Sequence, residues 1–157
     1  MACEQALSLT STALSPVPLV EVKLTLPSRI AIISPFVEQL MCFIAKFRNR
    51  GGSELDVEMA LREALASAIV HGNRQDSRWS VYVTCRCTIN GEVSITVEDG
   101  GQGFDPDAVA DPTTTENRLL TQATKRLMDE VRFERRGAAV YMCKASYERP
   151  GSGKKKA

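Results

Sequence analysis

Two short segments hold the residue types that could do chemistry. The first is EALASAIVHGN, which begins at Glu63 inside a helix-like pattern, and the second is DGGQGFDP, which begins at Asp99 directly after a strand-like run. A carboxylate on a helix face can act as a general base. A carboxylate among glycines can accept a hydrogen bond from the amino group of a base, because the backbone can come close. Each segment alone is weak evidence, since most helix glutamates are solvated and most D-x-G-x-G loops are simple turns.

The histidine and the cysteines exclude several kinds of site. Glu63, Ser67 and His71 recur every four residues, which stacks them on one face of the predicted helix. His71 is the only histidine, so any site that needs two is excluded. The five cysteines are scattered and do not form a disulfide framework. Cys85 and Cys87 could be half of a metal site, but no second Cys or His pair completes four ligands, so we expect buried thiols.

The elements that must position the two segments are predicted from periodicity and capping residues. Residues 19–26 alternate apolar and polar side chains and predict a strand. Ser34, followed by proline, predicts the start of a helix that ends near Arg50. Ser53 predicts the start of a second helix, which runs to about His71 and stops at the glycine and asparagine that follow.

A β-hairpin is the clearest local signal in the chain. Residues 81–89 and 93–97 alternate around Asn90-Gly91, the strongest two-residue turn signal. After a polar loop come a helix and a last hairpin, over about residues 118–129, 131–135 and 138–147. Because helices interrupt hairpins without alternating singly with strands, we predict an α+β fold. It should be a two-layer sandwich, a mixed or antiparallel sheet with helices on one face.

Composition limits the function classes. The chain has 157 residues, 43% hydrophobic and 25% charged, and a formal net charge of +1, which is typical of one globular domain. We predict a disordered arm over residues 1–18, one domain over 19–148 and a disordered basic tail over 149–157. Three lysines in the tail could also form a basic patch. The charge balance argues against direct nucleic-acid binding, and no apolar run suggests a membrane span or signal peptide, so we expect a cytoplasmic protein.

In order and spacing, the two segments resemble the motifs of the GHKL superfamily, which has the Bergerat ATP-binding fold. They are similar in particular to the anti-sigma-factor serine/threonine kinases, whose motifs read E-A-x-x-N-A-x-x-H-G-N and D-x-G-x-G-F-D-P. The stretches 111–117 and 127–131 also look like that family, so the resemblance covers about residues 20–147. It implies a histidine-kinase-like ATPase domain with ATP and Mg²⁺ as cofactors.

The resemblance also implies roles for single residues and for partners. Glu63 would be the catalytic base that activates the attacking hydroxyl or water. Asp99 would bind the adenine amino group, and Gly101 and Gly103 would line the base pocket. The partners in such a family are a sigma factor and an anti-anti-sigma protein, and the regulator is often a homodimer.

Three elements depart from the family pattern. Ser67 stands where the family has the asparagine that binds Mg²⁺, and its hydroxyl is shorter and a poorer ligand than an amide carbonyl. The stretch between Asn117 and Leu127 should hold a second glycine box that binds the phosphates, but it contains no glycine. Ala138 stands where the family has a threonine near the base, and its side chain cannot hydrogen-bond.

These departures leave three functional hypotheses. The chain is a regulator that acts by protein–protein binding and binds ATP weakly or not at all. Alternatively, it is an active ATP- and Mg²⁺-dependent kinase that phosphorylates a serine or threonine of an anti-anti-sigma antagonist, although phosphoryl transfer depends on the parts that are altered here. The third hypothesis is a separate ATP-binding domain of unknown output. Tight, Mg²⁺-dependent ATP binding would favour the kinase.

Overall fold

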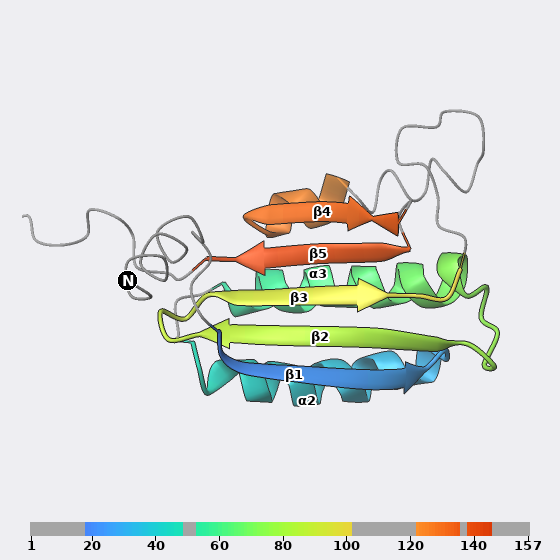
Figure 1. Ribbon diagram of the computed structural model, residues 1–157, viewed down its shortest axis with the longest axis horizontal. Coiled ribbons are helices and arrows are strands. Elements are labelled where there is room, and N and C mark those ends of the chain that lie inside the picture. The colour runs from blue at the N-terminus through green and yellow to red at the C-terminus, as the bar shows by residue number, and fades with distance from the viewer. Residues whose placement is uncertain (1–17, 49–52, 102–121, 136–137, 146–157) are drawn as a thin grey trace, which may run out of the picture.

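Five strands form one antiparallel sheet. The computed structural model describes residues 18–48, 53–101, 122–135 and 138–145, so the predicted arm, apart from its last residue, and the tail lie outside the described residues. The order across the sheet is β1-β2-β3-β5-β4, and each neighbouring pair is antiparallel (Figure 1). The strands are β1 (Pro18–Pro27), β2 (Ser80–Thr88), β3 (Val93–Glu98), β4 (Glu130–Glu134) and β5 (Ala139–Lys144).

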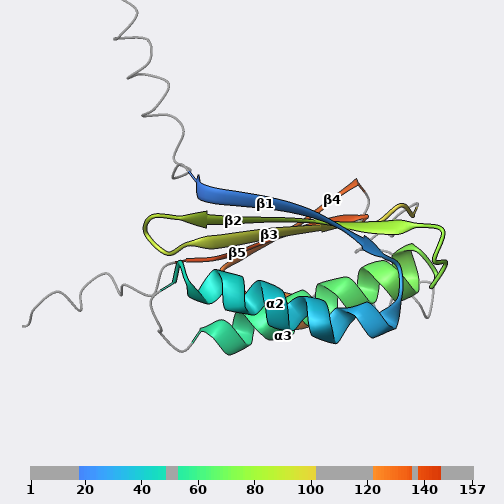
Figure 2. The same ribbon diagram turned by 90° about the horizontal axis from the view of Figure 1, so that it is seen from below.

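Helices lie on one side of this sheet. A short 3-10 turn, η1 (Ile30–Ile32), leads into α2 (Ile33–Ala45), and α3 (Glu54–Ser67) continues into a π-helical turn, η2 (Ala68–Gly72). Residues 122–127 are also helical. Figure 2 shows α2 and α3 together against one sheet face, with the opposite face open. The predicted α+β sandwich is confirmed, and within the described residues no helix is long and apolar enough to cross a membrane.

The apolar faces of β2 and β3 form the centre of the core. Cys85 and Cys87 are both fully buried in β2, which confirms the expectation of buried thiols. Each Å² of apolar surface that is buried stabilises the fold by about 25 cal/mol. The alternation in the sequence therefore decides which face of the hairpin packs against the helices. The other fully buried side chains of the hairpin and of the helix layer belong to Val81, Val83, Val93, Ile95, Val97, Val37, Ile44, Val57, Ala60, Leu61, Leu65 and Ile69.

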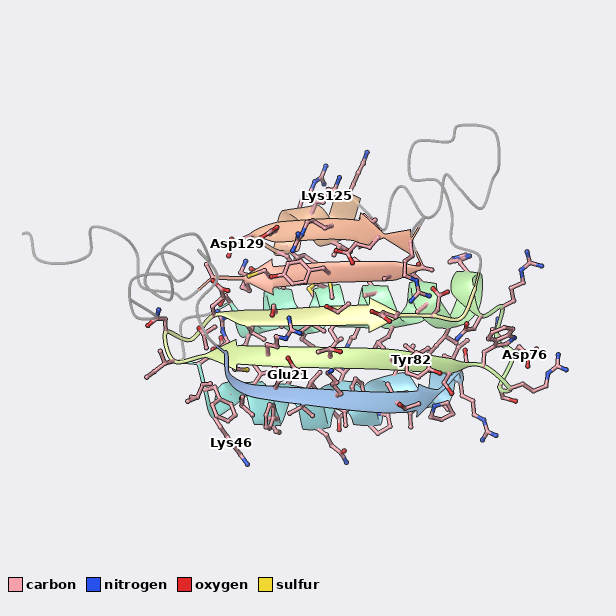
Figure 3. The ribbon with its side chains drawn as sticks, viewed as in Figure 1. Glu21, Lys46, Asp76, Tyr82, Lys125 and Asp129 are labelled. Carbon is pink, nitrogen blue, oxygen red and sulfur yellow. The ribbon has the colours of Figure 1, made fainter. Side chains whose placement is uncertain are left out.

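The open sheet face is polar. Glu21 forms an ion pair with Arg86 across the β1–β2 ladder, and the Arg132 guanidinium lies 4.4 Å from the ring centroid of Tyr141. Figure 3 shows Glu21 on this face, where the sticks of neighbouring strands stand towards the viewer. Exposed pairs of this kind contribute little to stability. The helix-covered face therefore supplies most of the folding free energy.

The first helix departs from its prediction at both ends. It begins at Ile33, directly after η1, and Ser34 makes no capping hydrogen bond because it lies inside the helix. The Ser34 hydroxyl instead accepts a hydrogen bond of 3.1 Å from Arg62 Nη1. The helix ends at Ala45 and not near Arg50, because the next backbone amides bond three residues back, Phe47 N to Ile44 O at 3.0 Å.

The early end of α2 lets the Arg48 side chain enter the protein. Arg48 is only 5% exposed. Its Nη1 donates hydrogen bonds to the carbonyl oxygens of Gly91, at 2.9 Å, and Lys144, at 3.1 Å. Nη2 donates to Ser53 Oγ at 2.7 Å and to the Ala145 carbonyl at 3.2 Å. Ser53 therefore stands at the predicted start of α3 but receives Arg48 instead of capping the helix with its own side chain. One guanidinium joins the start of α3, the β2–β3 turn and the end of β5.

Replacing Arg48 should destabilise the whole domain. Arg48→Met leaves several carbonyl oxygens without a donor, so we expect a loss of about 2–5 kcal/mol in the free energy of unfolding. Urea denaturation followed by circular dichroism measures this loss. Arg62→Met is the matched control, because Arg62 makes only partly exposed contacts, with Glu58 in α3 and with the Ser34 hydroxyl of α2, and their loss should cost under about 1 kcal/mol. Equal stability of the two variants would contradict the role given to Arg48.

Candidate functional site

The Asp99 carboxylate lies at the carboxyl end of β3 and is almost fully buried. The residue is 5% exposed, and its Oδ1 accepts a hydrogen bond of 2.7 Å from the Gly101 amide. Its own amide donates to the Ala138 carbonyl at 2.8 Å. The structure thus brings together three of the predicted site residues, Asp99, Gly101 and Ala138.

Two glycines allow the Asp99 carboxylate to come this close. A Cβ added to Gly72 would lie 2.1 Å from Asp99 Oδ2, and one added to Gly101 would lie 2.3 Å from the Gly72 carbonyl oxygen. Neither glycine has a positive φ, so each is needed for the space that it leaves and not for an unusual backbone conformation. The end of η2, the Asp99 side chain and the start of the following loop are in direct contact.

The helical stretch ends at Gly72, as predicted. Residues with a positive φ follow just after it, at Arg74, with φ of 52°, and Gln75, with φ of 58°. The backbone widens first into the π turn, where the Asn73 amide donates to the Ala68 carbonyl five residues back, at 2.8 Å. This wider turn carries Gly72 up to the carboxylate.

Asn73, which was predicted only to end a helix, connects the two motif segments. Its Oδ1 accepts a hydrogen bond of 2.8 Å from the Gly100 amide, and its Nδ2 donates to the Ser80 carbonyl at 3.0 Å. The side chain is buried and joins the helix end to the loop after β3 and to the start of β2. Its place directly after Gly72 in the first segment was the available signal.

Glu63 and Ser67 lie on α3, both half-buried and four residues apart. Gly72 lies nine positions after Glu63, and this spacing corresponds to about 13 Å along a helix axis. Figure 1 shows the carboxyl end of β3 and the C-terminal end of α3 at the same end of the molecule. The position of Gly103 lies outside the described residues.

Burial gives Asp99 an unusual electrostatic environment. Loss of hydration raises the pKa of its carboxyl above the ordinary value, and the Gly101 hydrogen bond and the charge of Arg135 oppose this rise. A buried acceptor that keeps its negative charge can bind an amino group strongly, because hydrogen bonds to charged groups contribute more than neutral ones. Among the described residues, no group of three or more His, Cys, Asp and Glu side chains could hold a metal ion.

Gly72→Ala should destabilise the protein through Asp99. The new Cβ would overlap the carboxylate, so we expect a loss of about 1–3 kcal/mol in the free energy of unfolding. In an Asp99→Ala background the obstacle is gone and the same substitution should cost much less. Chemical denaturation of the four proteins of this double-mutant cycle measures the coupling. Equal costs in both backgrounds would exclude the contact with Asp99 as the cause.

The raised pKa of Asp99 predicts a pH dependence of stability. Since the folded state holds this proton more tightly than the unfolded state, the ionised carboxylate costs stability above its folded-state pKa. The cost disappears as the pH falls towards and below the ordinary value of 3.8. Asp99→Asn should therefore be more stable than the original protein at pH 7, and the difference should shrink on acidification. Thermal unfolding across pH tests this, and a difference that grows on acidification would reverse the assignment.

Comparisons with known proteins support an ATPase fold. The crystal structure of the RsbU and RsbW domains of Rv1364c from Mycobacterium tuberculosis is similar, with a TM-score of 0.55 and 17% sequence identity, covering 82% of this chain. The chain spans only 32% of that protein's length. No curated protein sequence matches it. The sequence pattern of the histidine kinase-like ATPase domain matches residues 26–144, which include α3, η2 and the residues from Asp99 to Gly101. The resemblance to the GHKL ATPases is thereby confirmed, and the chain belongs to the histidine kinase-like ATPase domain family.

Proposed function

We propose that this protein is an anti-sigma-factor-like regulator that acts by binding other proteins and has a degenerate nucleotide site. One contrast supports the proposal: the buried acceptor Asp99 is present at the base end, whereas Ser67 and the glycine-free stretch between Asn117 and Leu127 stand where the metal and phosphate ligands would be. At the base end, the buried Asp99 carboxylate lies against Gly72 and Gly101. At the other end, Ser67 offers one hydroxyl where a metal needs a strong oxygen ligand.

The base end fits an adenine ring. Asp99 Oδ1 already accepts one amide hydrogen bond, but a carboxylate has room for further donors on both oxygens. An exocyclic amino group is such a donor. The absence of side chains on Gly72 and Gly101 lets the Asp99 carboxylate and the Gly72 carbonyl pack closely, which fixes the position of the acceptor. These features support recognition of a base even when the phosphates are held poorly.

The metal end does not fit Mg²⁺ well. Mg²⁺ is usually held by one or two carboxylates together with phosphate oxygens and waters. Here Glu63 would be the carboxylate and Ser67 the neighbour on the same helix face. If Glu63 served the metal, it would no longer be free to accept a proton from an attacking hydroxyl. Glu63 can act either as a metal ligand or as a proton acceptor, but not as both, so no catalytic step through the metal is proposed.

The phosphate end also lacks a glycine-rich lid. Residues 122–127, which fall within the stretch where the family has its second glycine box, are helical. The Met128 amide continues this pattern by donating to the Thr124 carbonyl at 3.0 Å. Amides that bond within a helix are not available to surround a triphosphate, unlike those of a glycine loop. Ala138 adds no hydrogen-bonding group beside the base.

The partners follow from the proposed role. The resemblance of the two motif segments to those of the anti-sigma-factor kinases supports a sigma factor and an anti-anti-sigma protein as partners, with exchange between them as the regulatory event. A homodimer and a cytoplasmic location are part of the same proposal, and transcription would be the process regulated. The formal net charge of +1 gives no reason to propose direct contact with nucleic acid.

An active kinase is the second candidate. The observation that favours it is the location of Glu63 on α3, half-buried and about two and a half helical turns before Gly72. Glu63 would accept the proton of a partner's serine or threonine hydroxyl during phosphoryl transfer. This candidate requires ATP and Mg²⁺ to bind despite the serine at position 67.

Nucleotide titration distinguishes the two candidates. We expect weak binding of ATP by the original protein, with little change when Mg²⁺ is added. Ser67→Asn should make binding depend on Mg²⁺ without restoring phosphoryl transfer, because the glycine lid is still missing. Asp99→Asn should weaken any nucleotide binding by about 1.5–3 kcal/mol, as expected for a hydrogen bond to a charged group.

Isothermal calorimetry with and without Mg²⁺ measures these affinities, and Glu63→Gln is the control that should leave adenine binding unchanged. If the original protein binds Mg-ATP at micromolar affinity and phosphorylates a partner, the regulator proposal is wrong and the kinase replaces it. Unchanged affinity in a folded Asp99→Asn protein would exclude Asp99 as the adenine ligand.

A further inference from the structure

The chain's only tryptophan lies against the loop that carries Asp99. A Cβ added to Gly100 would be 2.3 Å from Trp79 Cε3 and 2.8 Å from Cζ3, so the six-membered ring of the indole covers the Cα of this glycine. The residue as a whole is nevertheless 50% exposed to water. The indole therefore packs on a loop glycine of the site while half of the residue stays in contact with water.

We propose that Trp79 is a positioning residue that fixes the loop Asp99–Gly101, here called the Asp99 loop, so that the carboxylate points into the nucleotide site. The inference deepens the proposed function and rests on it for the identity of the ligand. Trp79 does not touch Asp99 in this role. It acts through Gly100, the residue between the carboxylate and the amide that binds it.

The Gly100 residue is held from two directions. Its amide donates to Asn73 Oδ1 at 2.8 Å, and its Cα is covered by the Trp79 ring. The two residues that flank Gly100 are also bonded to each other, because Asp99 Oδ1 accepts a hydrogen bond of 2.7 Å from the Gly101 amide. A loop of three residues with both peptide units fixed cannot rotate its aspartate without breaking one of these contacts. The indole adds a packing contact to these hydrogen bonds.

Trp79 itself stands on a fixed turn. Its amide donates to the Asp76 carbonyl at 3.1 Å, and its carbonyl accepts the Ser28 amide at 3.3 Å. The Asp76 carboxylate is in turn bound by the Arg78 amide at 3.0 Å and by the Arg78 guanidinium. Figure 3 shows Asp76 in the connection at the end of the molecule where β2 begins. The ring therefore has a rigid base from which to hold the Asp99 loop.

Substitutions at the two partners should depend on each other. Gly100 has no positive φ, so Gly100→Ala introduces no backbone strain and tests only the contact with the ring. Alone, it should push the indole away from the loop. In a Trp79→Ala background there is no ring to displace, so Gly100→Ala should have little further effect. This non-additivity is the signature of direct contact.

The first experiment needs no nucleotide. Amide hydrogen exchange, followed by NMR, reports how firmly the Gly100 and Gly101 amides are held. Trp79→Ala should speed exchange at these two amides by about tenfold or more, and Trp79→Phe should restore much of the protection because its ring can still cover Gly100. The matched control is Tyr82→Ala, which removes an aromatic side chain that is 49% exposed on the open sheet face and should leave both amides unchanged.

The second experiment measures ADP affinity in the same variants by calorimetry. We expect Trp79→Ala and Gly100→Ala to weaken binding by a similar factor of about 3–10, with no further loss in the double variant and none in Tyr82→Ala. Unchanged amide exchange in Trp79→Ala, or additive effects in the double variant, would overturn the positioning role. If the original protein binds no ADP, the proposed base site fails, while the exchange rates still decide whether Trp79 holds the loop.

Discussion

The register of α3 along the β2–β3 hairpin is the constraint on which the site depends. At the hairpin turn, Arg48 binds both Ser53, at the start of the helix, and the Gly91 carbonyl. At the other end, Asn73 binds the Gly100 amide and the Ser80 carbonyl. A helix held at both ends cannot slide or rotate. Since one residue of slip turns a helix by about 100°, these two anchors decide which side chains of α3 face the Asp99 end.

At Asp99, burial lowers folding stability but favours the binding of a hydrogen-bond donor. A carboxylate that is 5% exposed has lost hydration that one amide hydrogen bond replaces only in part. The protein tolerates this cost because Gly72 and Gly101 pack against the same side chain and the Ala138 carbonyl fixes its backbone. A group kept charged and poorly hydrated is suited to binding a hydrogen-bond donor, and that preference for function over stability is common at binding sites.

The sequence predicted what depends on local pattern and missed what depends on distant contacts. Alternation around Asn90-Gly91 predicted the central hairpin, and the two motif segments predicted that the helix end at Gly72 and the residues from Asp99 to Gly101 belong to one site. The pattern could not reveal that Arg48 reaches Gly91, 43 residues away, or that Asn73 reaches Gly100, 27 residues away. Ser34 looked like a helix cap because serine followed by proline is a local signal, whereas the 3-10 turn before it depends on how β1 leads into α2.

The same contacts explain how a nucleotide site can lose one end and keep the other. Gly72, Asn73, Asp99 and Gly101 hold one another, so their replacement would disturb the packing of α3 on the sheet as well as any ligand. Ser67 is only half-buried and occupies a position where a polar side chain can change without opening the core. Under the proposed function, a substitution at the base end would therefore cost both folding stability and ligand binding, and one at the metal end would cost ligand binding alone. In the regulator that we propose, the metal end can therefore change while the fold and the Asp99 end persist.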